Sequence, residues 1–237
     1  SERADVLVPE ATIQRCDLRG GSVTVHLTLD GGGSPLNRLH IFLNGVPVLG
    51  ADGRTIDGMR AEGEQTVRLT GGTNRLEVCC TNQAGVESHR AARLLRRQEV
   101  TRGDLYYIGI GVSEYKDKRL NLGYAHQDAL DLAALFKQYT KYFERVHVKT
   151  FVNETVTRDV LKKAKELLRE AKTDDTVIVL VAGHGLHDRT AGADYYFLTW
   201  DADLGALADT ALSYKAIEDL FDGIKPLRKL LLMDTCE

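Results

Sequence analysis

Residues 176–185 read TVIVLVAGHG and residues 229–236 read KLLLMDTC. Each stretch is mostly apolar and has near its end a side chain able to do chemistry, His184 in the first and Cys236 in the second. Continuous apolar runs of this length are typical of strands buried on both faces of a parallel sheet. Beyond the carboxyl ends of such strands, ligands and catalytic groups collect in turns held by a rigid base. We therefore expect His184 and Cys236, each in a glycine- or aspartate-rich turn, to face each other if the two strands are neighbours.

Strand and helix patterns alternate around these two runs. The strand patterns cover residues 105–112, 146–152 and 195–200, and the helix patterns cover residues 125–139, 157–172 and 213–221. Thr157 and Ser213 have the side chains that cap helix starts. Such alternation predicts an α/β fold with a doubly wound, mostly parallel sheet and helices on both faces. We expect residues 99–237 to form this domain.

The first part of the chain has a different pattern. Short alternating stretches lie at residues 22–29, 38–43, 65–69 and 74–81, separated by turn signals such as Asn44-Gly45. All lysines lie at or after Lys116, so composition also changes near residue 100. Residues 72–88, GTNRLEVCCTNQAGVES, resemble the last hairpin of bacterial immunoglobulin-like modules. We expect an all-β immunoglobulin-like sandwich over residues 1–98, with residues 93–102 as the join.

Composition excludes several classes of partner. Lys+Arg 31 against Asp+Glu 34 gives a net charge of −3, and no run of five or six basic residues occurs, so no nucleic-acid partner is expected. The apolar runs are far shorter than the ~20 residues that span a bilayer, so no membrane partner is expected. The chain opens on Ser1 without a signal pattern, and we expect the native start to lie elsewhere.

The cysteines favour a reducing compartment. Cys79 and Cys80 are adjacent and Cys236 is the penultimate residue, and this spacing does not favour a disulfide framework. The predicted localisation is therefore cytoplasmic. Within a strand, Cys79 and Cys80 should face opposite sides, one into the core and one outward.

His184 and Cys236 together predict a nucleophilic site. An imidazole that takes the thiol proton leaves a thiolate able to attack a carbonyl carbon. The alternative is that both are structural residues, a satisfied histidine and a small core hydrophobe. His187 gives an H-x-x-H spacing, but without a helix or a nearby cysteine pair it does not favour zinc. The glycines of residues 108–112 do not complete a dinucleotide fingerprint, because Glu114 occupies the third glycine position.

The second half resembles the caspase-like cysteine peptidases, in particular the bacterial caspase-homologue and metacaspase branch. The resemblance rests on five motifs in family order: LYYIGIGVSEY (105–115), YAHQDALDLAALF (124–136), DDTVIVLVAGHG (174–185), YYFLTWDAD (195–203) and KLLLMDTC (229–236). It implies that His184 is the general base and Cys236 the nucleophile. It also implies an oxyanion hole made by the backbone N–H groups of Gly185 and Cys236.

Substrate preference can be argued from charge. Where animal caspases hold an aspartate with an arginine and a glutamine, this chain has Leu122 and Asp234. It resembles instead the metacaspases that cleave after Arg or Lys, with Asp128 and Asp234 in a partly desolvated pocket that binds a cation. The alternative for Asp128 is that it only begins a helix, where the helix dipole favours an acid.

The resemblance also predicts partners and regulation. The family continues past the nucleophile into a small subunit, so we expect a segment or second chain to complete the sheet. We expect a regulated protease of a bacterial signalling or defence pathway, with protein or peptide substrates and a possible regulatory protein partner. No cofactor or metal is assigned. Metacaspases often use calcium through an acidic cluster, and Asp201 and Asp203 are acidic, so calcium dependence stays open, but this chain does not support it. Arg96-Arg97 in the join is a candidate self-cleavage site. The alternative function is a catalytically silent scaffold or interaction module.

Overall fold

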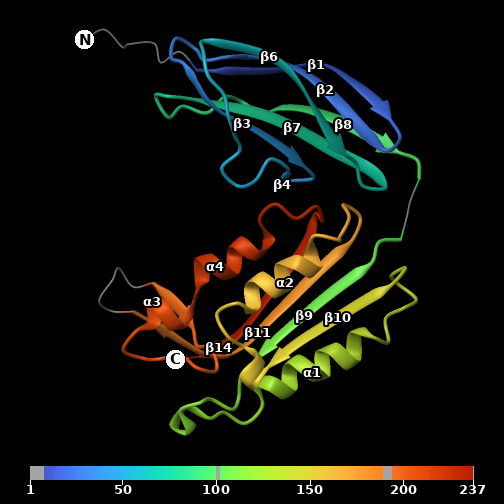
Figure 1. Ribbon diagram of the computed structural model, residues 1–237. Helices are drawn as coiled ribbons and strands as arrows, with labels where there is room; N and C mark the ends of the chain where they lie inside the picture. Colours follow the sequence, from blue (N-terminus) through green and yellow to red (C-terminus); the bar gives the residue numbers. More distant parts are fainter. Residues whose placement is uncertain (1–7, 100–101, 189–193, 237) are drawn as a thin grey trace. The chain divides into compact units, whose positions relative to one another are not determined.

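The computed structural model describes residues 8–99, 102–188 and 194–236 (Figure 1). Contacts divide the chain into two compact units, Ser1–Thr101 (unit 1) and Arg102–Glu237 (unit 2). Each unit is described by itself below. No helix in the described part of the chain is long and apolar enough to cross a membrane.

The expected join over residues 93–102 is wrong in its first half. Residues up to Arg97 belong to strand β8 (Ala91–Arg97), which pairs antiparallel with β7 (Gly72–Asn82). Arg96 pairs with Thr73, and Arg97 is only 7% exposed. Arg96-Arg97 is therefore part of a sheet and not an exposed linker, and residues 100–101 lie outside the described residues.

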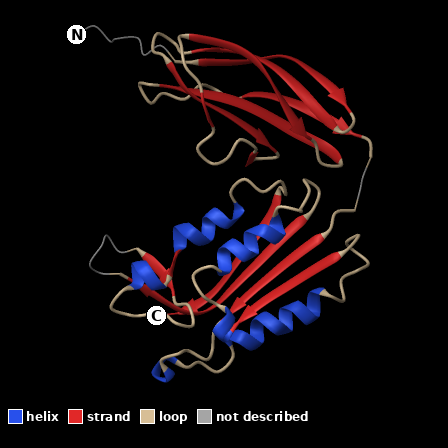
Figure 2. Ribbon diagram, viewed as in Figure 1, coloured by secondary structure: helices blue, strands red, loops and turns tan. Residues whose placement is uncertain are grey.

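Unit 1 contains two antiparallel sheets, with strand orders β1-β2-β6 and β4-β3-β7-β8, and β5 pairs with β3 (Figure 2). The remaining strands are β1 (Glu10–Arg19), β2 (Ser22–Asp30), β3 (Leu36–Leu43), β4 (Val46–Pro47), β5 (Arg54–Thr55) and β6 (Arg60–Arg68). Every second residue of β2, from Val23 to Leu29, is buried, as a strand with one face on the core requires. The antiparallel β structure predicted for this part is confirmed.

Cys79 and Cys80 are both buried, at 1% and 0% exposure, so the expectation that one faces outward is wrong. Cys80 Sγ lies 3.6 Å from the Glu10 carbonyl oxygen of β1. Cys79 is covered because the chain turns back after β7 and places Glu87 Oε1 3.4 Å from its Sγ. Burial, and then the charge of Glu87, raises the pKa of Cys79 to about 12. Cys16, Cys79 and Cys80 are free thiols.

Unit 2 is built on a mixed six-stranded sheet. Four strands are parallel in the order β10-β9-β11-β14, while β12 pairs antiparallel with β11 and β13 with β12. The strands are β9 (Leu105–Gly111), β10 (Val146–Val152), β11 (Thr176–His187), β12 (Tyr195–Phe197), β13 (Leu212–Ser213) and β14 (Arg228–Cys236). The helices are α1 (Ala125–Phe136), α2 (Val160–Leu168), α3 (Leu207–Thr210) and α4 (Tyr214–Glu218), with short 3-10 turns η1 (Lys118–Leu120), η2 (Asn153–Thr155) and η3 (Asp219–Phe221). The predicted α/β class is confirmed, with a mixed sheet because of the β12-β13 extension.

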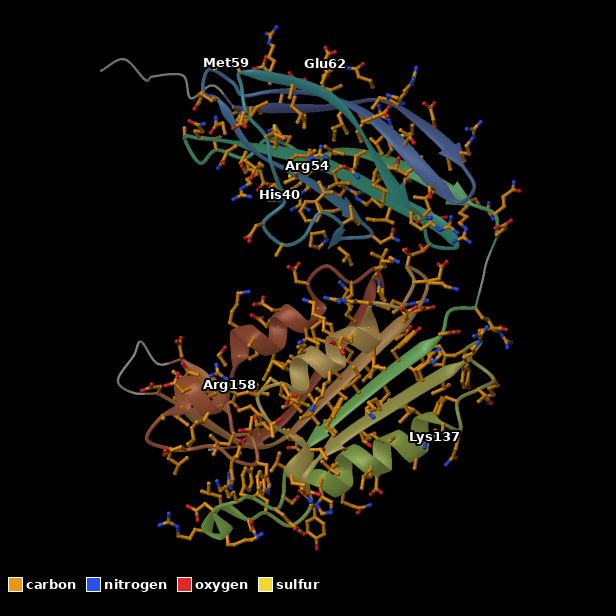
Figure 3. All side chains as sticks on the ribbon, in the orientation of Figure 1. His40, Arg54, Met59, Glu62, Lys137 and Arg158 are labelled. Atoms are coloured by element: carbon orange, nitrogen blue, oxygen red, sulfur yellow. The ribbon has the colours of Figure 1, made fainter. Side chains whose placement is uncertain are left out.

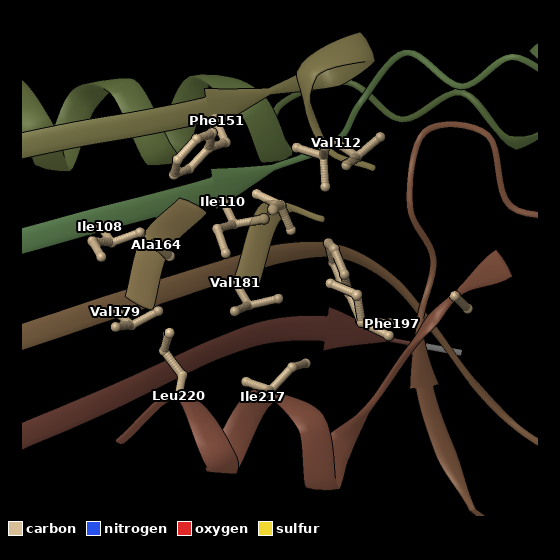
Figure 4. Packing of buried hydrophobic residues seen from close by; sticks show 14 of the residues in the cluster. Ile108, Ile110, Val112, Phe151, Ala164, Val179, Val181, Phe197, Ile217 and Leu220 are labelled. Atoms are coloured by element: carbon tan, nitrogen blue, oxygen red, sulfur yellow. The ribbon is translucent and has the colours of Figure 1, made fainter. Parts of the chain in front are cut away.

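Helices cover both faces of this sheet. Val179 and Val181 of β11 pack with Ile217 of α4 in the larger core cluster (Figure 4). Leu180, on the opposite face of the same strand, packs with Ala129 of α1. Successive side chains of β11 thus face opposite sides of the sheet, and helices cover both sides. This explains why the sequence of β11 is continuously apolar.

The glycines of β9 allow α1 to pack close to the sheet. A Cβ at Gly111 would lie 2.5 Å from the Ala125 carbonyl oxygen, and one at Gly109 would lie 3.1 Å from Ala129 Cβ. Only glycine permits such an approach without movement of the helix backbone. The residues that resembled an incomplete dinucleotide fingerprint thus serve helix–strand packing.

Helix ends differ from the expected ranges. α2 begins at Val160, and the Thr157 hydroxyl donates to the Asp159 carboxylate instead of capping the helix. Ser213 caps α4 as predicted, its hydroxyl accepting from the Ala216 N–H at 3.2 Å. α1 ends before the exposed Lys137 (Figure 3).

Candidate active site

His184 lies near the carboxyl end of β11, and hydrogen bonds fix its backbone. Its N–H donates to the Tyr115 hydroxyl (3.0 Å), and its carbonyl accepts from the Leu198 N–H (3.0 Å). The expectation that His184 follows the strand in a turn is wrong, because β11 continues to His187 by pairing first with β14 and then with β12. His184 is therefore held within a sheet.

The imidazole of His184 has a defined hydrogen-bond partner. Nε2 lies 3.0 Å from the carbonyl oxygen of Leu120. Because a carbonyl oxygen only accepts, Nε2 carries the hydrogen, and in the neutral ring Nδ1 then carries the lone pair. The Tyr115 ring, with its centroid 5.4 Å from that of the imidazole, packs beside it. Nδ1 is thus the atom of this ring that can accept a proton.

Side-chain amides anchor the loop that carries Leu120. Asn121 Oδ1 accepts from the Tyr115 N–H (2.9 Å), and Asn153 Oδ1 accepts from the Ser113 N–H (3.0 Å). Asn153 itself adopts a left-handed backbone with φ 47°, a conformation that asparagine tolerates better than most residues. The Leu120 carbonyl is therefore positioned by the ends of β9 and β10.

Cys236 is the last residue of β14, and its backbone lies beside that of His184. The parallel register pairs His184 with Cys236 and Ala182 with Asp234. Neighbouring strands lie about 4.7–4.9 Å apart, so the two expected catalytic residues are adjacent at the level of the backbone. The side chain of Cys236 lies outside the described residues.

The Gly185 N–H points toward the side of β11 on which β14 lies. The Ala182 carbonyl accepts from the Val112 N–H at the end of β9 (3.0 Å), and the His184 carbonyl, two residues on, faces the same side and accepts from Leu198. The peptide that follows His184 is trans, and in a trans peptide the C=O and N–H point in opposite directions. The Gly185 N–H is therefore directed away from β9 and toward the strand that ends in Cys236.

Asp128 and Asp234 lie on the same face of the sheet. Asp128 is half-buried in the first turn of α1. Leu232 packs in the α1 core cluster, and Asp234, two residues later in β14, falls on that same face. Burial raises the pKa of the neighbouring Tyr107 hydroxyl, and the charge of Asp128 raises it further. Asp234 is exposed, so the partly desolvated pocket expected around this carboxylate stays a prediction.

Other expected polar residues have local partners. The His187 ring lies edge-on to the Tyr195 ring, 5.2 Å between centroids. Asp201 Oδ1 accepts from the Thr199 hydroxyl (3.0 Å), and Asp203 Oδ1 accepts from a backbone N–H two residues on (2.9 Å). Within residues 8–99, 102–188 and 194–236, no group of three or more His, Cys, Asp or Glu side chains is placed to hold a metal ion.

The sequence analysis did not identify three groups near His184, namely the Leu120 carbonyl and the hydroxyls of Tyr115 and Tyr195. Leu120 acts through its carbonyl, which every residue possesses. Tyr115 and Tyr195 belong to apolar motifs in which an aromatic residue is ordinarily a core residue. Their hydroxyl contacts depend on chain segments that meet only in the folded unit.

A family model described as the caspase domain matches residues 108–237. No curated protein matches the sequence significantly. Among solved structures, OgpA from Akkermansia muciniphila is 10% identical with a TM-score of 0.31, over 40% of this chain and 30% of that one. BC0361, a polysaccharide deacetylase from Bacillus cereus, is 10% identical with a TM-score of 0.24, over 90% of this chain and 66% of that one. Scores this low do not establish a common fold.

Proposed function

Because the chain belongs to the caspase-domain family, we propose that it is a cysteine endopeptidase that hydrolyses peptide bonds in proteins, with Cys236 as nucleophile and His184 as general base. The observation that carries this proposal is the parallel register that sets Cys236 beside His184. A shift of one residue would move the two side chains to opposite faces.

In the first half of the reaction, His184 Nδ1 takes the proton of the Cys236 thiol. The Nε2–H bond to the Leu120 carbonyl supports this role, because it orients the ring and stabilises the imidazolium that forms. The thiolate attacks the substrate carbonyl carbon, and the N–H groups of Gly185 and Cys236 bind the developing oxyanion. The imidazolium then protonates the leaving amine, and a thioester with Cys236 is left.

In the second half, water attacks the thioester. His184 accepts the water proton, the same two N–H groups bind the second oxyanion, and the Cys236 thiolate leaves and recovers a proton.

Cleavage after Arg or Lys is the specificity that the charges favour. Asp128 and Asp234 share one face at the carboxyl edge of the strands, where they can form charge-assisted hydrogen bonds with a guanidinium or ammonium. A substrate aspartate would add a third negative charge there, and the half-buried Leu122 offers no cation to receive it. Since Asp234 is exposed, we expect discrimination of about ten- to hundredfold, smaller than for a buried pair.

The edge of the sheet suggests how the enzyme is completed. In the described part of the chain β14 pairs only with β11, and Leu230 on it is 47% exposed. An open strand edge of this kind accepts another strand. We propose that a small-subunit segment or chain pairs here, in a regulated cytoplasmic protease of a bacterial signalling or defence pathway.

Covalent labelling tests the proposed nucleophile. A peptidyl-arginine chloromethyl ketone should add to Cys236 of the purified full protein, as seen by mass spectrometry, and Cys236→Ala should abolish both label and turnover. His184→Ala should lower turnover at least about a thousandfold, because the two residues act as a unit. The matched controls Cys16→Ala and His89→Ala, which change a free thiol and an exposed imidazole of unit 1, should retain turnover. Turnover in folded Cys236→Ala, or binding without labelling in the unsubstituted protein, would favour a silent scaffold instead.

Matched peptide reporters test the specificity. Reporters that differ only in Arg, Lys or Asp before the scissile bond should be cleaved in the order Arg and Lys far above Asp. Asp234→Asn should lower kcat/KM for the basic reporters about tenfold and leave the Asp reporter unchanged or improved. Efficient cleavage of the Asp reporter alone would show that these carboxylates do not face the residue before the bond.

A further inference from the structure

Tyr195 reaches across β11 to bind the strand on its far side. The residue lies in β12, where its backbone pairs with His187 of β11. Its hydroxyl donates to the hydroxyl of Thr235 in β14, which flanks β11 on the other side. A Cβ at Gly185 would overlap the Tyr195 hydroxyl and ring, so the side chain passes directly over Gly185.

Both ends of this contact adjoin the site. Gly185 follows His184, and Thr235 precedes Cys236. The pairing of β11 with β14 ends at His184 and Cys236 within the described residues, so ladder hydrogen bonds fix the strand spacing only up to that point. The tyrosine contact spans the two strands at the place where the ladder stops.

We propose that Tyr195 is a positioning residue that holds the backbones of Gly185 and Cys236 at the spacing their two N–H groups need to bind one oxyanion. This inference rests on the proposed function. Oxyanion donors act only when they are preorganised, because reorganisation during the reaction cancels much of their electrostatic benefit. Tyr195 acts through the backbone, so its loss should cost less than the loss of a donor. We expect a decrease in kcat of about tenfold, the effect of one neutral hydrogen bond.

The experiment separates oxyanion binding from thiol reactivity. A peptide aldehyde inhibitor forms a tetrahedral adduct whose oxygen occupies the oxyanion site, whereas iodoacetamide alkylates a thiolate by displacing iodide and forms no oxyanion. In the full protein, Tyr195→Phe should lower kcat and aldehyde affinity about tenfold, with KM and the rate of Cys236 alkylation within about twofold of the unsubstituted values.

Matched variants test the hydroxyl pair itself. Thr235→Val should reproduce the effect of Tyr195→Phe, whereas Thr235→Ser keeps a hydroxyl and should retain nearly full activity. The double variant, Tyr195→Phe with Thr235→Val, should be no less active than either single variant. Tyr142→Phe removes an exposed hydroxyl from the segment after α1 and should have no effect.

Three results would overturn the inference. Turnover by Tyr195→Phe at the unsubstituted rate would overturn only the inference about Tyr195 and leave the proposed function intact. A parallel loss of alkylation and turnover would show a general disturbance of the site rather than loss of oxyanion binding. Absence of both turnover and Cys236 labelling in the unsubstituted protein would overturn the proposed function together with this inference.

Discussion

Substitution of Gly111 by alanine should destabilise unit 2 by pushing α1 away from the sheet. The added Cβ would lie 2.5 Å from the Ala125 carbonyl oxygen and 2.9 Å from His126 Cα. Both are backbone atoms of the first turn of the helix, so no side-chain rotation relieves the overlap. The helix must shift, and contacts such as that between Ala129 and Leu180 must loosen.

The loss of stability expected for Gly111→Ala depends on which atoms the new Cβ meets. Overpacking a filled site costs about 1–3 kcal/mol, and rigid backbone neighbours place this one in the upper half, at about 2–3 kcal/mol. The free energy of unfolding falls by about 1–3 kcal/mol for each molar of urea, so the urea concentration at the unfolding midpoint should fall by about 1 M.

The single tryptophan provides a selective assay. Trp200 lies in unit 2, so its fluorescence in a urea titration follows that unit and not unit 1. Gly123→Ala is the matched control, because a Cβ there meets no atom within 4 Å, and it should change the unfolding free energy by less than about 0.5 kcal/mol. The reasoning would be refuted if Gly111→Ala unfolded within that same margin of the unsubstituted protein.

Two further predictions concern buried polar groups. Burial raises the pKa of Tyr115 to about 12 from 10, so its contribution to stability is complete below pH 10 and is lost as pH rises through 12. The urea stability of unit 2, followed by Trp200, should therefore decline above pH 10, and less steeply in Tyr115→Phe; equal slopes would contradict the assignment. In unit 1, the fully buried Asn74 accepts from the Thr70 N–H (2.9 Å) and donates to the carbonyls of Thr70 (2.9 Å) and Gly72 (3.0 Å). Asn74→Ala should cost about 2–4 kcal/mol, because it leaves buried backbone groups unpaired, and should shift only the unit 1 transition in calorimetry; an unmoved transition would show that water replaces the amide.

Much of the fold could be predicted because its signals are local. The continuous apolar run of β11 and the alternating burial of β2 reflect the period of a strand, and Ser213 caps α4 through a contact three residues away. Two of the errors occurred where another segment of the chain intervened. Cys79 is buried by Glu87 after a chain reversal, and β11 is extended past Ala182 by pairing first with β14 and then with β12.

The sequence by itself determined the alternation of strands and helices in unit 2, the antiparallel strands of unit 1, and the placing of His184 and Cys236 near the ends of two apolar strands. These features follow from backbone periodicity and from side chains within a few residues of one another. Only the tertiary structure decided the register that pairs His184 with Cys236, the Leu120 carbonyl that orients the imidazole, and the Tyr195 hydroxyl that crosses to Thr235. Each of these joins residues about 40 or more positions apart along the chain, and such contacts depend on strand pairing and packing, which no local pattern encodes.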